Sequence, residues 1–134
     1  MSRLPRVVLT RFDHTRLTQL LERAGERWEL DPLRAQVARA EIIDAPSVPA
    51  DLVTMNSVVR FADEASGKEL EITLVFPGAD EVDSARISVF SHIGTALLGL
   101  SVGDSIDWPQ PNGRPRRLQV VDIAYQPEAA GDPV

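Results

Sequence analysis

The spacing of apolar residues changes from a helical to a strand-like period partway along this chain, and that change constrains the fold more than any other feature. Up to residue 43 the apolar residues recur every three or four positions, as on one face of a helix. From Val53 onward they alternate with polar residues, as in strands that bury one face. Residues 44–49 lie between the two patterns and contain two prolines, which interrupt a helix. The sequence therefore predicts an α+β fold in which a helical part precedes a sheet.

The first predicted helix follows Thr10. Thr10 or Asp13 is expected to cap its N-terminus, and Gly25 marks its C-terminus, because glycine readily adopts the conformation that ends a helix. One face of the helix holds its apolar side chains, which are Leu17, Leu20, Leu21 and Ala24. A helix of about three turns is only marginally stable alone, so this face needs a packing partner.

The second predicted helix provides that partner. Asp31 is its expected N-cap and Pro32 its expected first residue, where the missing N–H of proline is not needed. We expect this helix to end near Ile43, just before the two prolines. Two such helices pack antiparallel into a hairpin of about 15–18 Å, at a rise of about 1.5 Å per residue. Residues 1–46 are thus predicted to form a short helical hairpin, or coiled coil.

The tip of this hairpin offers three candidate contact residues, Glu26, Trp28 and Glu29. An exposed tryptophan is a strong interface anchor, but Trp28 could instead fold back over the apolar seam of the hairpin. The acids at the tip, together with Asp31, could reach toward a metal ion or a partner protein. Alternatively, they form a solvated loop and an N-cap.

Residues 47–134 are predicted to form a small antiparallel sheet with one short helix. The helix begins at residue 91, where Ser91 is the expected N-cap. The apolar phase of the last strand shifts between Val120 and Val121, so either a bulge or burial on both faces is expected there, and residues 126–134 should be loop. The alternating apolar pattern places strands at residues 53–61, 70–76, 87–89, 106–108 and 117–125, with turns at 63–67 and at Asn112-Gly113.

The search for catalytic and cofactor-binding motifs is negative. The chain has no cysteine, which excludes disulfides, thiolate metal sites and cysteine nucleophiles. His14 and His92 are far apart and outside any metal-ligand spacing. General acid–base work by His92 is conceivable, but no paired carboxylate or nucleophile accompanies it. The spacing of the glycines matches neither a phosphate loop nor a dinucleotide fingerprint, so no enzyme activity, cofactor or metal is predicted.

The charge distribution favours a protein partner over nucleic acid. Up to residue 45 the chain has eight arginines and seven acids, whereas the remainder has six basic and thirteen acidic residues. An acidic module does not release phosphate counterions, and the small basic patch of Arg114, Arg116 and Arg117 lacks aromatic stacking partners. The acidic run at residues 80–83 reads as a solvated loop. No apolar stretch resembles a signal peptide or a membrane span, so we expect a cytoplasmic monomer.

Two sets of residues resemble a known family. Residues 88–99 read S-V-F-S-H-I-G-T-A-L-L-G, followed by V-G-D at 102–104. This resembles the hallmark of the C-terminal domain of the Gre transcript-cleavage factors, S-x-x-S-P-I-G-x-A-L-L-G-x-x-x-G-D. The stretches V-T-M-N-S at 53–57 and Y-Q-P-E-A-A-G-D at 125–132 are similar to the Rnk branch, named for regulation of nucleoside diphosphate kinase. The resemblance covers nearly the whole chain.

The resemblance implies an FKBP-like fold for about residues 50–126 and binding at the secondary channel of RNA polymerase. In Gre factors the loop before the short helix contacts a coiled coil at the channel rim, which points here to Ser91, His92, Ile93 and Gly94. His92 stands where Gre factors have proline. Gre factors also hold a catalytic magnesium with acids at the tip of a longer hairpin, a role that this short hairpin does not share.

These observations predict a transcription elongation regulator that occupies the secondary channel and competes with Gre factors without stimulating transcript cleavage. Two alternatives stay open. The fold analogy suggests a peptidyl-prolyl isomerase, whose apolar pocket would need several of the aromatic residues Phe61, Phe76, Phe90, Trp108 and Tyr125. The Rnk resemblance suggests an effect on nucleoside diphosphate kinase, by direct contact or through transcription.

Overall fold

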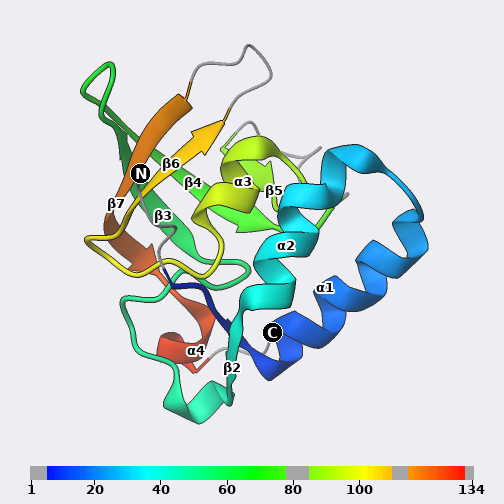
Figure 1. The fold of residues 1–134 in the computed structure, drawn as a ribbon. Helices are drawn as coiled ribbons and strands as arrows, with labels where there is room; N and C mark the ends of the chain where they lie inside the picture. The colour runs from blue at the N-terminus through cyan, green and yellow to red at the C-terminus, as the bar shows by residue number, and fades with distance from the viewer. Residues whose placement is uncertain (1–5, 78–84, 110–114, 132–134) are drawn as a thin grey trace.

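The computed structural model describes residues 6–77, 85–109 and 115–131, and it has a mixed α+β architecture. Helices α1, α2 and α3 gather on one side of a curled five-stranded sheet (Figure 1). In chain order the elements, with 3-10 turns marked η, are β1 (Val8–Thr10), α1 (Arg11–Ala24), η1 (Trp28–Leu30), α2 (Asp31–Arg39), β2 (Glu41–Ile43), η2 (Ala45–Ser47), β3 (Val58–Asp63), β4 (Lys68–Val75), β5 (Arg86–Ser88), α3 (His92–Leu97), β6 (Ser105–Pro109), β7 (Pro115–Tyr125) and α4 (Pro127–Ala130).

Helix α1 begins and ends at the predicted residues. The Thr10 hydroxyl accepts a hydrogen bond from the Asp13 N–H at 3.0 Å, so Thr10 is the N-cap and Asp13 is not. Gly25 follows the last turn with a φ of 70°, a left-handed conformation that favours glycine. Leu17 and Leu21 are buried on the predicted face. The N-cap and the apolar spacing together fix which face of α1 turns toward the core.

The start and end of the second helix differ from the prediction. Leu30 occupies the N-cap position and Asp31 is already helical, because turn η1 brings the chain into the helix without a side-chain cap. The helix ends at Arg39 rather than near Ile43. Residues 41–43 form β2, which pairs in parallel with β1. Strands of three residues are too short to display a two-residue alternation, so the sequence favoured a longer helix.

The five-stranded sheet has the order β5-β4-β3-β7-β6. The β4–β5 pair is parallel, so the prediction of a wholly antiparallel sheet is wrong for that edge. The predicted bulge is confirmed: Phe61 faces Val120 and Arg60 faces Asp122, which leaves Val121 without a partner on β3. The strand expected from residue 53 begins at Val58.

Three further differences concern the ends of strands. Residues 53–57 form a loop instead of a strand, with Asn56 at a φ of 67°. Leu70 was predicted on the buried face but is exposed, because the first half of β4 extends beyond the core. The tail contains α4 rather than loop alone. The turn at Asn112-Gly113, the acidic run at residues 80–83 and Arg114 lie outside the described residues.

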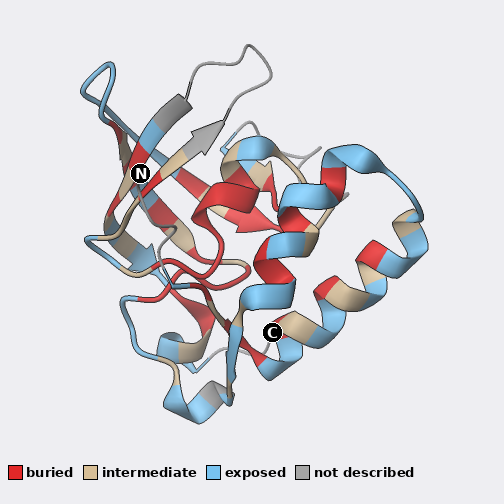
Figure 2. Ribbon diagram, viewed as in Figure 1, coloured by how far each residue is buried: buried red, intermediate tan, exposed pale blue. Residues whose placement is uncertain are grey.

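A single hydrophobic cluster spans the helices and the sheet. Leu17 and Leu33 from α1 and α2 belong to the same cluster as Phe61, Leu74 and Leu97. Figure 2 shows this buried layer between α2, α3 and the sheet. The division of the chain near residue 46 stays a prediction. None of the described helices combines the length and apolar composition that a bilayer span requires.

Candidate interaction surface beside helix α3

The loop before α3 is held by hydrogen bonds among its own residues. The Ser88 hydroxyl accepts from the Phe90 N–H at 3.0 Å, and the Ser88 carbonyl accepts from the Ser91 hydroxyl at 2.7 Å. The Ser91 hydroxyl oxygen accepts from the Gly94 N–H at 3.0 Å, which confirms Ser91 as the N-cap. The Thr95 hydroxyl donates to the Val89 carbonyl at 2.7 Å. These neutral pairs fix the loop in one conformation.

Two glycines of the motif are required by close packing. A Cβ at Gly94 would overlap the Ser88 carbonyl oxygen, so only glycine lets α3 approach the end of β5 this closely. Gly99 has a φ of 78° and lies against Val7 and Val8, and its carbonyl accepts from the Val8 N–H at 3.1 Å. Gly99 thus joins the α3 segment to β1. Both glycines of the family-like motif therefore serve to pack the α3 segment against β1 and β5.

The four predicted polymerase-contact residues differ in what they expose. Gly94 is buried, and Ser91 is half-buried with its hydroxyl occupied by the cap. Ile93 is half-buried and packs against the core. His92 is exposed. A partner at this loop would therefore meet His92 first, with the accessible parts of Ser91 and Ile93 around it.

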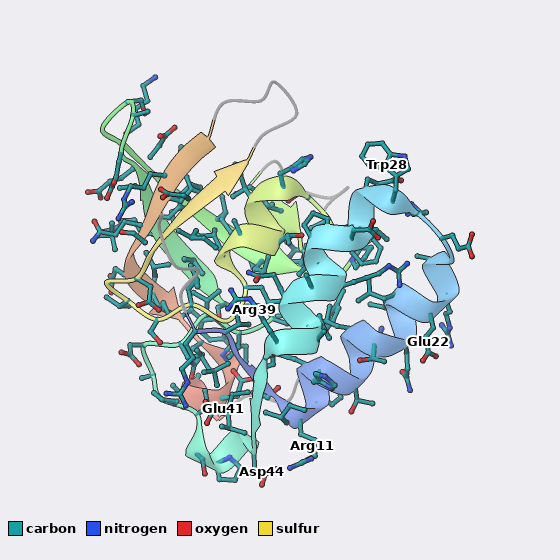
Figure 3. All side chains as sticks on the ribbon, viewed as in Figure 1. Arg11, Glu22, Trp28, Arg39, Glu41 and Asp44 are labelled. Atoms are coloured by element: carbon teal, nitrogen blue, oxygen red, sulfur yellow. The ribbon has the colours of Figure 1, made fainter. Side chains whose placement is uncertain are left out.

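The hairpin tip presents an exposed tryptophan. Trp28 is 79% exposed, so it does not fold back over the hairpin seam (Figure 3). Glu26 is exposed as well. Glu29 accepts from the Arg27 guanidinium at 2.9 Å, and its pKa is held below the ordinary value by its own backbone N–H and then by Arg27. The tip therefore combines one large apolar side chain with charged groups.

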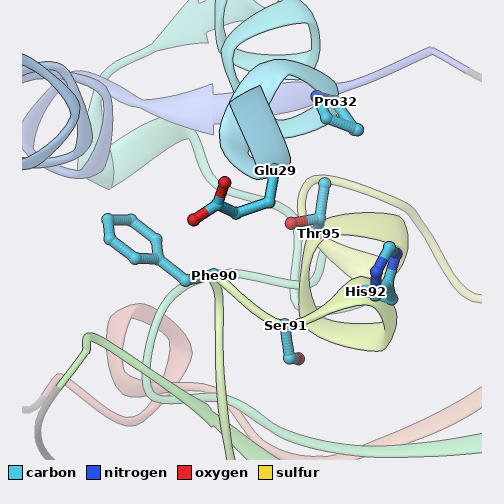
Figure 4. A pocket seen from close by; sticks show the side chains of 6 residues that line it. All are labelled: Glu29, Pro32, Phe90, Ser91, His92 and Thr95. Atoms are coloured by element: carbon cyan, nitrogen blue, oxygen red, sulfur yellow. The ribbon is translucent and has the colours of Figure 1, made fainter. Parts of the chain in front are cut away.

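The tip and the α3 loop lie side by side. A pocket of about 220 Å³ is formed by Glu29 and Pro32 from the hairpin and by residues of the α3 segment (Figure 4). The Arg27 guanidinium lies 6.0 Å from the centre of the Phe90 ring, within range of a cation–π contact. The structure thus brings two of the predicted contact regions together. The pocket-lining residues of the α3 segment are Phe90, Ser91, His92 and Thr95.

A second polar site, which the sequence did not indicate, lies at the other end of the hairpin. Asp13 is 1% exposed, and its carboxylate accepts from the Met55 N–H at 3.1 Å. The Thr54 hydroxyl donates to Glu128 of α4 at 2.7 Å. Asp13 was missed because an acid three residues after a threonine looks like a capping residue. A usable signal was that Thr54 and Glu128 belong to the two Rnk-like stretches.

Within the described ranges, no three histidine, aspartate or glutamate side chains gather as a metal site requires. The pocket beside α3 has a single aromatic lining residue, Phe90. Phe61 is fully buried in the core instead. The exposed side chains of the α3 loop and the hairpin tip include His92, Trp28, Glu26 and Glu29.

Comparison with known proteins identifies the family to which this chain belongs. The model of the family described as "Transcription elongation factor, GreA/GreB, C-term" matches residues 48–125, so the chain belongs to that family. Within the family, it is 40% identical over 134 residues to the "Regulator of nucleoside diphosphate kinase" of Escherichia coli K12, with 98% of each chain covered. This confirms the resemblance to the Rnk branch.

Two other relatives support the same family. A solved GreA/GreB elongation factor from Nitrosomonas europaea has a TM-score of 0.72 and 40% identity, and the match covers 90% of this chain and 99% of that one. GreA of Syntrophus aciditrophicus is 32% identical over 99 residues, covering 74% of this chain and 61% of GreA. The relatives are named as regulators and transcription factors rather than as enzymes.

Proposed function

We propose that this chain is a transcription elongation regulator that binds RNA polymerase at the rim of the secondary channel. There it competes with Gre factors without stimulating transcript cleavage, and it has no catalytic activity of its own. The observation that supports this most directly is the position of the hairpin tip beside the Ser91–Gly94 loop (Figure 4). The family match to elongation factors supports the same role.

The contact surface in this proposal consists of two parts. His92 and the accessible parts of Ser91 and Ile93 are the contacts of the α3 loop. Trp28, with Glu26 and Glu29 beside it, extends the surface onto the hairpin tip. An exposed aromatic residue next to a rigid loop is the kind of anchor that dominates binding energy in protein interfaces.

The dimensions of the hairpin argue against a cleavage role. Helix α1 has 14 residues and α2 has 9, which correspond to about 21 Å and about 14 Å at about 1.5 Å per residue. The tip is also adjacent to the loop that would dock on the channel rim. A tip beside the docking point leaves Glu26 and Glu29 near the rim rather than deep in the channel.

The domain organisation belongs to the same proposal. We take residues 1–46 as a short coiled-coil hairpin and residues 47–134 as an FKBP-like unit, because the family match begins at residue 48 and covers the sheet and α3. In this view the chain acts in the cytoplasm as a monomer and binds the polymerase as a protein partner, without reading a nucleic-acid sequence.

A competition assay tests the proposal. Backtracked elongation complexes are treated with a fixed amount of GreB, and rising amounts of this protein should slow RNA cleavage. His92→Ala should need at least about tenfold more protein for the same inhibition, which corresponds to about 1.4 kcal/mol. His14→Ala is the matched control, because His14 lies on α1 near the opposite end of the hairpin.

Each outcome of this assay has a defined meaning. Failure of excess protein to slow cleavage would refute competition. Cleavage stimulated by the protein alone would refute the non-cleaving role. If His92→Ala inhibits as well as the unmodified protein, the regulator role survives but the α3 loop is not its contact.

Direct binding to nucleoside diphosphate kinase is a second candidate. The observation in its favour is the name of the Escherichia coli relative, which is 40% identical over 98% of this chain. Pull-downs with purified kinase and with purified polymerase, each presented separately, distinguish the two. Retention of the kinase by this chain in the absence of polymerase would favour direct regulation.

A further inference from the structure

The base of the hairpin contains a buried polar junction between three separate segments. Asp13 of α1 accepts from the Met55 N–H in the loop of residues 49–57. Glu128 of α4 accepts from the Thr54 hydroxyl, which also lies 2.8 Å from the Ser57 hydroxyl. Gln126 donates to the carbonyls of that loop at 2.7 and 2.8 Å. We call Asp13, Thr54, Ser57, Gln126 and Glu128 the base cluster.

Two carboxylates of the base cluster have an oxygen with no partner. Asp13 is 1% exposed, and its Oδ1 atom has no hydrogen-bond partner within the described part of the chain. The same holds for the Oε2 atom of Glu128. Buried carboxylate oxygens without donors are unfavourable, because the lost hydration is not replaced. Among the described residues, no donor satisfies either oxygen.

Among the described residues, the groups that act on the Asp13 carboxyl supply no compensating positive charge. The neighbours that act on its carboxyl are the Met55 N–H from the loop, Thr10 at the end of β1 and Glu128 from α4. The two arginines nearest to Asp13 in sequence are engaged elsewhere: Arg11 pairs with Asp44 at 2.9 Å (Figure 3), and the Arg16 guanidinium lies 5.2 Å from the centre of the Phe76 ring. The electrostatic neighbour of Asp13 in the base cluster is therefore another acid.

A proton on one of the two carboxyl groups would remove the repulsion between them and supply the missing donor. Two neighbouring carboxyl groups, one buried and the other half-buried, disfavour simultaneous ionisation, and the buried one retains its proton to higher pH. A protonated carboxyl is a donor, so its O–H can bond to a free oxygen of the other acid, directly or through one water. This removes the repulsion and satisfies both unpartnered oxygens.

We propose that the base cluster is a proton-operated lock: a proton on Asp13, donated toward Glu128, holds α1, the loop of residues 49–57 and α4 together, and its loss loosens their junction. The lock is a regulatory device separate from the proposed polymerase contact. The base cluster includes Asp13 near the start of α1, whereas Trp28 follows the end of that helix (Figure 3). Its test needs no polymerase, so the two proposals stand or fail independently.

The direction of the pH effect follows from the environment of Asp13. Burial, with a further contribution from Glu128, raises the pKa of Asp13 from 3.8 to about 6. The folded chain therefore binds more protons than the unfolded chain between these two values. The stability that the proton contributes is complete below about pH 4 and is lost as the pH rises through about 6. The lock therefore opens in the approach to neutral pH.

Denaturant unfolding at pH values from 4 to 8 tests the lock. Asp13→Asn retains an acceptor for the Met55 N–H. Its amide NH₂ is a donor at every pH, in place of the carboxyl proton of Asp13. The ratio of unfolding constants, unmodified protein over Asp13→Asn, should rise about sixtyfold from pH 4 to pH 8. Asp104→Asn is the matched control, because Asp104 also accepts a backbone N–H, that of Ser101 at 2.9 Å, at a half-buried site.

A second variant and a local measurement guard against failure of Asp13→Asn to fold. Glu128→Gln also supplies a donor and should lower the midpoint of the pH transition. Exchange of the Met55 amide hydrogen, corrected for its intrinsic pH dependence, should quicken above pH 6 in the unmodified protein and not in Asp13→Asn. A carbon-13 titration of the Asp13 carboxyl should show its midpoint near 6.

Three results would overturn the lock. The first is an identical pH profile for the unmodified protein, Asp13→Asn and Glu128→Gln. The second is a carboxyl titration of Asp13 below pH 4. The third is full stabilisation of the unmodified protein at pH 8 by added Mg²⁺, Ca²⁺ or Na⁺ with no effect on Asp13→Asn, which would identify a cation site instead.

Discussion

The loop before α3 and the base cluster are both held by side-chain hydrogen bonds, but they differ in charge. The junction before α3 is built from Ser88, Ser91 and Thr95, whose hydroxyls are neutral and bonded to the backbone. The base cluster also contains hydroxyls, but it adds two acids with unpartnered oxygens. A neutral network holds one geometry at every pH, whereas an acidic one depends on its protons. The first suits a fixed recognition surface and the second suits a switch.

Gly94→Ala should break the α3 junction and have the largest effect. The new Cβ would overlap the Ser88 carbonyl oxygen, which is backbone and cannot rotate away. We expect a loss of about 3–5 kcal/mol in the free energy of unfolding, measured in denaturant. Gly67→Ala is the control: Gly67 has a positive φ, which Gly94 does not, but its surroundings are open, so about 1 kcal/mol is expected. Equal losses for the two variants would show that the α3 segment adjusts.

Gln126→Glu should destabilise the base cluster, because it replaces a donor with a carboxylate of nearly the same size and shape. The Gln126 amide donates to two carbonyls, those of Pro49 and Leu52, and a carboxylate in its place would face them without a proton. We expect a loss of about 2–3 kcal/mol at pH 7, as for a buried group left unsatisfied, and a smaller loss at pH 5, where the glutamate can be protonated. Gln119→Glu is the control, because Gln119 is a half-buried residue of β7. It should change the free energy of unfolding by less than about 0.5 kcal/mol. A loss that does not vary with pH would contradict the charge explanation.

The difference between the junctions also shows what the sequence could predict. The α3 junction is local: Ser91 bonds to Gly94 three residues later, and apolar residues at helical spacing follow. The cap, the helix and the candidate contact residues were therefore predictable from one stretch. The alternating pattern likewise predicted β4 and the bulge at Val121.

The base cluster was not predictable because its contacts are distant in sequence. Asp13 bonds to a loop 42 residues away, and Thr54 bonds to Glu128 across 74 residues. Propensity describes each segment alone, so the loop at 53–57 was predicted as strand and α4 as loop. The β1–β2 pair was missed for the same reason. Tertiary pairing decided these segments, and a single sequence does not display it.

Ser91→Ala should weaken the α3 junction without destroying it. The substitution removes the acceptor for the Gly94 N–H, and loss of a serine N-cap costs about 1 kcal/mol. Ser66→Ala is a suitable control, because Ser66 makes a 3.3 Å bond to the Lys68 N–H in an exposed turn. That variant should lose less than about 0.5 kcal/mol. A pH-dependent loss in Ser91→Ala would contradict the distinction between a neutral and an acidic junction.

Trp28→Ala should weaken the proposed polymerase contact while leaving the stability of the fold nearly unchanged. Trp28 is 79% exposed, so the free energy of unfolding should change by less than about 0.5 kcal/mol. If the hairpin tip and the α3 loop form one contact surface, the same variant should need at least about tenfold more protein to inhibit GreB-dependent cleavage. Phe12→Ala is the matched control, since Phe12 is 47% exposed at the other end of α1 and should affect neither measurement strongly. A large loss of stability in Trp28→Ala would show that the tryptophan packs against the protein. Unchanged inhibition would instead restrict the contact to the α3 loop.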